Sequence, residues 1–146
     1  MGNAVAYESD FYGWAMEQAR LLRTGRLTEA DIENIAEEIE GMGRSRKSEL
    51  VSRLAVMLLH LLKWQFQPGL RGQSWRLSVM NQRDQLASHI EENPSLKPVI
   101  PEALSRAYRY ARRDAERDTG LPEATFPQVS PWTFEQIMDD GFWPEA

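Results

Sequence analysis

The stretch from Ser45 to Phe66 limits the fold more than any other part of the sequence. Placed on a helix at about 100° per residue, it has a wide apolar face and further apolar residues on the far side. The wide face consists of Leu50, Val51, Leu54, Met57, Leu58, Leu61 and Leu62, and the far side carries Val56 and Leu59. Because a helix that is apolar on most sides must be covered by other helices, we predict a central helix at about 45–66 in an all-α helical bundle.

The remaining sequence contains helix boundaries and no alternating strand pattern of useful length. The expected helices cover 10–23, a segment that begins at Thr28, 74–92, 101–119 and a short C-terminal helix from Thr133. Gly41 and Gly43 predict a break or kink before the central helix, because each glycine costs about 1 kcal/mol inside a helix. We therefore expect about five helices plus a short C-terminal helix, in a single domain over residues 1–146.

Two apolar features lie outside the central helix. The second helix places Ile32, Ile35, Ile39 and Met42 on one stripe. Aromatic residues gather near both ends of the chain: Phe11, Tyr12 and Trp14 at the front, and Trp132, Phe134, Phe142 and Trp143 at the end. Aromatic side chains at helix ends usually close a small core, so we expect the closing segment to pack onto the bundle. A contiguous exposed patch would instead indicate a partner surface.

Composition excludes several classes of protein. The 146 residues include no cysteine, which excludes disulfides, thiolate zinc sites and cysteine nucleophiles. No run approaches the ~20 apolar residues of a membrane span, and the opening residues lack a signal-peptide pattern, so we expect no membrane association and a cytoplasmic location. Residues 1–43 carry 3 basic and 9 acidic side chains, whereas residues 44–92 carry 8 and 4. This asymmetry indicates either that acidic and basic helices pair electrostatically or that the charges are spread over an ordinary solvated surface.

Sequence motifs indicate no enzyme class, because phosphate-binding loops, nucleophile elbows and calcium loops are absent. Catalytic activity stays open, with a noncatalytic protein favoured. His60 and His89 are the two histidines. A metal site in a helical bundle typically uses Glu-x-x-His, but Met57 and Leu86 occupy the position of the glutamate. We therefore expect no metal and no cofactor.

Polar residues at the edges of the predicted apolar faces allow two interpretations. An arginine there needs a carboxylate partner, and Glu38 is the natural candidate. The favoured interpretation is an interhelical ion pair that fixes which helices face each other. The other is a polar cleft that binds a ligand, formed by Glu37, Glu38, His60, Arg76 and Arg83.

A stripe of arginines lies on the outer face of the fifth helix. It consists of Arg106, Arg109, Arg113 and Arg117. Such a stripe can contact nucleic acid, but acidic residues alternate with it and the formal net charge is -5. A solvated charged face is the favoured interpretation, and nucleic acid is not an expected partner.

Six segments form a recognisable combination: DFYGWAMEQARLLR, DIENIAEEIEGMGRS, LLHLLKWQFQP, SWRLSVMNQR, TGLPEATFP and the closing FWP. Together they resemble the domain of unknown function family 29, which is bacterial and abundant in cyanobacteria. The resemblance covers nearly the whole chain and implies an all-helical domain without an assigned activity, substrate or cofactor. The segments contain Glu37, Glu38, Arg44, His60, Trp64, Trp75 and Arg76 as candidate residues.

Three functions follow in order of preference. The first is a noncatalytic protein-interaction module (an adaptor, regulator or antitoxin-like protein) that binds a protein partner or a second copy of itself. The second is a small-molecule, metal-binding or enzymatic bundle that uses the polar cleft. The third is nucleic-acid contact through the arginine stripe.

Overall fold

The computed structural model describes residues 2–145, and all of their regular structure is helical. This confirms the all-α prediction. The chain divides into two compact units, Met1–Ser45 and Arg46–Ala146, which are described separately below. The single domain over 1–146 stays a prediction, and its terminal residues 1 and 146 lie outside the described part. None of the described helices has the length and apolar character needed to cross a membrane.

Unit 1 contains α1 (Gly2–Ser9), α2 (Phe11–Arg23), the short 3-10 turn η1 (Leu27–Glu29) and the start of α3 (Ile32–Phe66). Asp10 caps α2, since its carboxylate accepts a hydrogen bond from the Gly13 amide at 3.0 Å. The helix α1 was not expected from the sequence. Its Tyr7 packs edge-on against Trp14, with ring centroids 4.6 Å apart, and this contact attaches α1 to α2.

The start predicted at Thr28 for the second helix is wrong by four residues. Leu27–Glu29 forms a 3-10 turn, and the helix begins at Ile32 after Asp31. Asp31 satisfies the first turn of α3: its carboxylate accepts from the Asn34 side chain at 2.8 Å and from the Asn34 amide at 3.4 Å. The helix therefore begins after Asp31 and not at Thr28, because Asp31 provides the hydrogen bonds that the first turn of the helix needs.

Of the break or kink predicted at Gly41 and Gly43, the break is wrong, since α3 continues through both residues. The predicted second helix and central helix are therefore one helix. Glycine lowers the stability of a helix without preventing it, and the surrounding residues are mostly good helix formers. An ion pair from Glu37 to Arg44, 2.7 Å long, also spans the two glycines.

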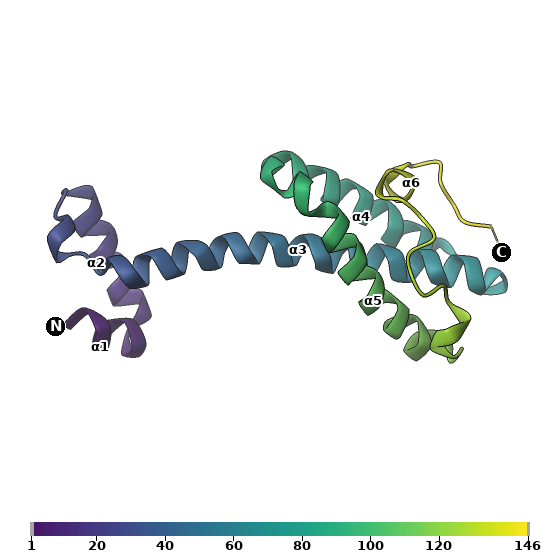
Figure 1. Cartoon of the computed structure of the whole chain (residues 1–146), viewed down its shortest axis with the longest axis horizontal. Helices are drawn as coiled ribbons and strands as arrows, with labels where there is room; N and C mark the ends of the chain where they lie inside the picture. The colour runs from purple at the N-terminus through teal and green to yellow at the C-terminus, as the bar shows by residue number, and fades with distance from the viewer. Residues whose placement is uncertain (1, 146) are drawn as a thin grey trace. The chain divides into compact units, whose positions relative to one another are not determined.

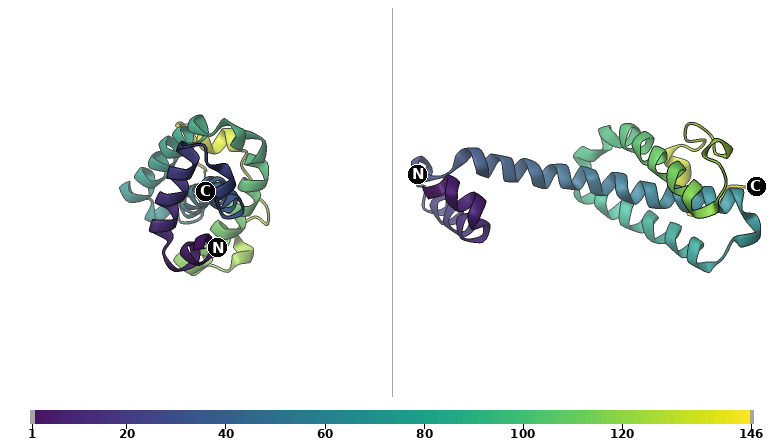
Figure 2. Two further views of the ribbon diagram at one scale, coloured as in Figure 1. Left: turned by 90° about the vertical axis from the view of Figure 1, so that its left-hand side faces the viewer. Right: turned by 90° about the horizontal axis from the view of Figure 1, so that it is seen from below.

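Unit 2 consists of the continuation of α3 with α4 (Gln73–Glu92), α5 (Ile100–Thr119) and the short α6 (Phe134–Met138). Connecting 3-10 turns are η2 (Pro68–Leu70), η3 (Pro94–Val99) and η4 (Glu123–Thr125). Within this unit α4 and α5 lie against α3, and the C-terminal segment lies over the bundle (Figure 1, Figure 2). The predicted central role of 45–66 is confirmed, because every residue of its wide apolar face is buried.

The later helix boundaries agree closely with the sequence prediction. Gly120 ends α5 with φ 76°, a left-handed conformation that glycine adopts without strain. Thr133 and Gln136 form the reciprocal hydrogen bonds of a capping box at the start of α6. The predicted packing of the closing aromatic residues is confirmed as well: Trp132 is buried, and Phe142 and Trp143 contact the core.

Candidate functional site

The five residues of the predicted polar cleft are divided between the two units and have separate surroundings. In unit 1, Glu37 pairs with Arg44 on the exposed side of α3. Glu38 accepts a hydrogen bond from the Tyr7 hydroxyl, and the pKa of Tyr7 is raised to about 12 by this carboxylate. Glu38 thus has a tyrosine partner where the ion-pair interpretation expected an arginine.

In unit 2, Arg83 is only 2% exposed and donates to three backbone carbonyls instead of a carboxylate. Its guanidinium reaches the carbonyl oxygens of Ile137 at 2.7 Å, Asp140 at 3.3 Å and Phe142 at 2.7 Å. It also lies 5.0 Å from the ring centroid of Trp143, and burial lowers its pKa. Arg83 therefore holds the C-terminal segment against the bundle.

A second arginine, which sequence reasoning missed, acts on the same segment. Arg71 donates to the carbonyl oxygens of Trp64 at 2.7 Å and Pro144 at 3.3 Å. Trp64 in turn packs against Trp143, with ring centroids 4.6 Å apart. The available signal was the group of aromatic residues in the final segment, since arginine often stacks on aromatic rings.

His60, His89 and Arg76 do not converge on a common point within unit 2. His60 Nδ1 lies 2.8 Å from the Val56 carbonyl oxygen of its own helix, and burial lowers its pKa. His89 is buried, with Nε2 at 2.8 Å from the Arg46 carbonyl oxygen and Nδ1 at 3.6 Å from Glu49. Arg76 is exposed. Among residues 2–145 no group of three His, Asp or Glu side chains is arranged to hold a metal ion.

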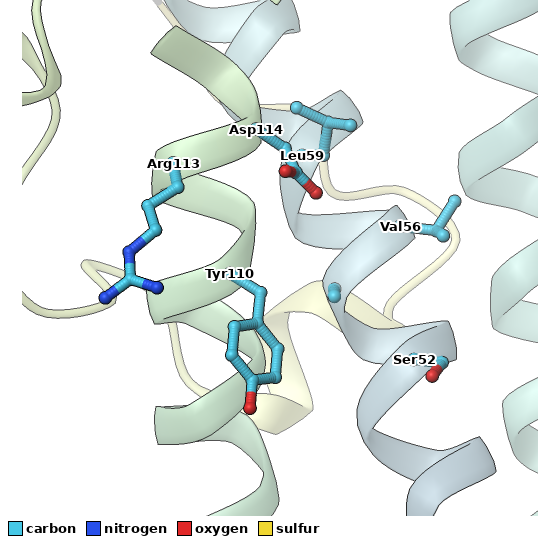
Figure 3. A pocket seen from close by; sticks show the side chains of 7 residues that line it. Ser52, Val56, Leu59, Tyr110, Arg113 and Asp114 are labelled. Carbon is cyan, nitrogen blue, oxygen red and sulfur yellow. The ribbon is translucent and has the colours of Figure 1, made fainter. Parts of the chain in front are cut away.

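Unit 2 has an open groove of about 450 Å³ between α3 and α5 (Figure 3). Its lining residues are Ser52, Ala55, Val56, Leu59, Tyr110, Arg113 and Asp114. Asp114 pairs with Arg117 at 3.3 Å, and Figure 3 shows the Arg113 side chain extending on the side of α5 away from α3. The polar groups therefore do not form a constellation of nucleophile, acid and base.

The arginine stripe of α5 borders a smaller hollow of about 220 Å³, lined by Arg109, Arg112, Arg113, Glu123 and Gln128. Arg112 donates to the Phe126 carbonyl oxygen at 3.2 Å and pairs with Glu123 at 3.3 Å. Its guanidinium is thus engaged in holding the loop after α5. Arg112, at the side of the stripe, is therefore structural, whereas the four arginines of the stripe itself are exposed and lie among acidic residues.

The apolar groove of unit 1 is the candidate site, and we call it the α2–α3 groove. It has a volume of about 330 Å³. Its lining residues are Phe11, Trp14, Ala15, Gln18, Ala19, Leu22, Ile35, Glu38, Ile39 and Met42. The large apolar side chains at its rim are strongly exposed, with Ile39 at 58% and Met42 at 63%.

The floor of the α2–α3 groove is fixed by buried polar contacts. Trp14 donates from Nε1 to Asp31 at 3.0 Å, and hydrogen bonds from Asn34 and Trp14 hold the pKa of Asp31 below its usual value. Gln18, only 3% exposed, accepts a hydrogen bond at Oε1 from the Asp31 amide at 2.7 Å. Its Nε2 group has no partner among the described residues. The floor therefore combines a rigid aromatic ring with an unused hydrogen-bond donor.

Sequence reasoning identified only part of this site. It placed Ile35, Ile39 and Met42 on one stripe and grouped Phe11 with Trp14, but it missed the face of α2 formed by Ala15, Gln18, Ala19 and Leu22. The signal was present, because these four residues follow the i, i+3, i+4, i+7 spacing of one helix face.

Comparison with known proteins gives a family and no function. No curated protein and no solved structure matches the sequence. Residues 6–143 match the family described as Domain of unknown function DUF29. This match confirms the resemblance drawn from the six segments and covers nearly the whole chain, and the chain therefore belongs to the DUF29 family.

Proposed function

We propose that this chain is a noncatalytic protein-interaction module that receives a helix of another molecule in the α2–α3 groove. The observation that carries the proposal is the exposure of large apolar side chains on both sides of one groove. An apolar groove between two helices is a common receptor for the apolar face of a third helix. Contiguous apolar surface on an otherwise polar protein usually marks such a contact.

The small core of unit 1 supports the same proposal. Trp14 and Leu21 are its only buried apolar side chains within residues 6–45, whereas Phe11, Leu22, Ile39 and Met42 remain exposed. A segment of this size has difficulty burying enough apolar surface alone. A third helix in the groove would cover these side chains and enlarge the core.

The buried Gln18 also supports a partner. A buried amide donor without an acceptor costs about 1–3 kcal/mol, so proteins rarely leave one unpaired. Gln18 lines the groove but its Nε2 is itself buried, so an acceptor on an inserted helix would pair with Nε2 once the side chain turns toward the groove. The cost would then be removed on binding.

The polar-cleft function has weaker support. Of its residues, Arg83 holds the C-terminal segment, and Glu38 bonds Tyr7. The arginine-stripe function is also weaker, because acidic side chains pair with part of the stripe. We also propose that the module acts in the cytoplasm of a bacterium; the bacterial distribution implied by the family resemblance supports the bacterial source.

Site-specific photocrosslinking tests the proposal. A photoreactive amino acid replaces Ile39 in the groove or, as a matched control on the same helix, Glu33, which is exposed and does not line the groove. In cells that naturally contain the protein, we expect a crosslink to one defined helical segment from position 39 and none from position 33. Equal labelling from both positions, or no crosslink from position 39, would contradict the proposal.

A further inference from the structure

The charge of unit 1 indicates which kind of helix fits its groove. Residues 1–45 carry nine acidic and four basic side chains, whereas residues 46–146 carry thirteen of each. Three of the four basic residues are already paired: Arg20 with Glu17, Arg26 with Glu29 and Arg44 with Glu37, at 2.6 to 2.7 Å. The surplus negative charge of this unit is therefore not neutralised internally.

One of the surplus carboxylates lies in the groove itself. Glu38 is the charged residue among the ten that line the groove, and it is half-buried beside Ile35 and Ile39. It accepts a hydrogen bond from Tyr7 but pairs with no basic side chain among the described residues. A carboxylate has room for more than one donor, so Glu38 keeps the capacity to accept from an incoming cation.

We infer that the α2–α3 groove binds the apolar face of a cationic amphipathic helix from a different protein. This inference rests on the proposed function. Lysine or arginine beside that apolar face would meet Glu38. Ala15 and Ala19 are small residues one turn apart on α2, which allows the partner helix to approach closely.

A second copy of the chain fits the groove less well because of charge. Two copies joined at this face would bring together two units that each carry five excess negative charges, including two Glu38 carboxylates. Like charges at an interface oppose association, whereas a cationic helix is both attracted and steered to an acidic surface. The charges therefore favour a different protein over a homodimer.

The test uses three labelled helical peptides with one identical leucine stripe and a polar face made of lysine and arginine, of glutamate, or of glutamine and serine. Fluorescence anisotropy gives the Kd of each peptide for the full chain. We expect the cationic peptide to bind at least about tenfold more tightly than the acidic one, with the difference shrinking as salt is added. We also expect Ile39→Gln to weaken the cationic peptide about tenfold, which locates binding in the groove.

Two charge-neutralising variants separate local pairing from general attraction. Glu38→Gln removes the groove carboxylate, and we expect it to weaken the cationic peptide about fivefold while leaving the uncharged peptide unchanged. Glu33→Gln removes the same charge from the same helix outside the groove, and we expect less than about a twofold effect. Equal effects of the two variants would overturn the assignment of Glu38.

The outcomes distinguish this inference from the proposed function. Equal affinity for all three peptides, with all weakened by Ile39→Gln, would overturn the cationic partner and leave the interaction module standing. A homodimer in native mass spectrometry that Ile39→Gln converts to a monomer would likewise overturn the different-protein partner and make the second copy the occupant. Binding of no peptide, or binding that Ile39→Gln does not change, would overturn both proposals.

Discussion

Units 1 and 2 differ in how completely their apolar side chains are buried. In unit 2, α4, α5 and the C-terminal segment pack around α3 (Figure 1), and side chains such as Leu54, Leu58 and Leu62 are completely buried. In unit 1, Ile39 and Met42 lie on the same helix α3 and remain more than half exposed. One helix thus serves as the centre of a closed core in one unit and as the wall of an open groove in the other. The difference shows that apolar pattern alone does not identify a core.

Truncating one apolar side chain in each unit should produce the largest contrast. Leu58 is 0% exposed, so Leu58→Ala should lower the free energy of unfolding by about 3 kcal/mol through lost contacts and a cavity. Ile39→Ala in the exposed groove should change it by less than about 0.5 kcal/mol. Urea unfolding followed by tryptophan fluorescence measures both. A large loss for Ile39→Ala would mean that unit 1 already closes its core.

Removing the arginine that holds the C-terminal segment should have the next largest effect. Arg83→Met leaves three carbonyl oxygens without their donor and should destabilise unit 2 by about 2–3 kcal/mol. Arg83→Lys should recover little, since a single ammonium group cannot reproduce the planar set of donors. Arg76→Met, on the exposed side of the same helix, is the control and should be nearly neutral. Thermal unfolding compares the three variants.

A smaller gain is expected where α3 passes through its two glycines. A Cβ atom at Gly43 would meet no atom within 4 Å, so Gly43→Ala should stabilise the helix by about 0.5–1 kcal/mol. Gly120→Ala should have the opposite sign, because the left-handed backbone at φ 76° disfavours a side chain. If Gly43→Ala destabilised the protein, the continuity of α3 through this region would be in doubt. Hydrogen exchange of the α3 amides tests that continuity directly.

The smallest expected effect is a pH dependence confined to unit 1. The pKa of Asp31 is below its usual value because Asn34 and Trp14 donate to the charged carboxylate. The resulting stabilisation is present above the pKa of an unfolded aspartate, about 4, and disappears as the pH falls through the lower pKa of the folded state. The protection of the α2 amides against hydrogen exchange, measured relative to the intrinsic rate at each pH, should therefore fall on acidification below about pH 4.

Asp31→Asn provides the control for this pH dependence. Because the variant carries no titrating group at position 31, its α2 amides should be less protected than those of the wild type at neutral pH, and their protection should depend less on acid. Acid dependence equal to that of the wild type would assign the effect to another carboxylate of this unit.

The fold was largely predictable from the sequence, and the errors in that prediction have local causes. The apolar face of 45–66, the end of the helix at 119 and the helix start at Thr133 were all predicted from neighbouring residues. The break predicted at Gly41 and Gly43 was wrong, because the free energy that two glycines cost a helix is smaller than the free energy gained by continuing a long one. The start at Thr28 was wrong because Asp31, three residues later, makes the better set of hydrogen bonds.

The candidate site was less predictable. The sequence selected Glu38, His60 and Arg83 as polar edge residues, but each has its own partner in the fold, among them the Tyr7 hydroxyl for Glu38 and backbone carbonyls for Arg83. Such partners are far away in the chain: Arg83 and Phe142 are separated by 59 positions. No helical wheel contains that information.

Helical class, a central apolar helix and the caps near the C-terminus follow from the amino-acid sequence alone, because they depend on periodicity and on hydrogen bonds between close neighbours. Which apolar faces are covered does not follow from it. The stripe of Ile35, Ile39 and Met42 resembles a core stripe on a wheel, yet these side chains line an open groove. Their exposure depends on which distant segments pack against α3, and that is a property of the tertiary structure.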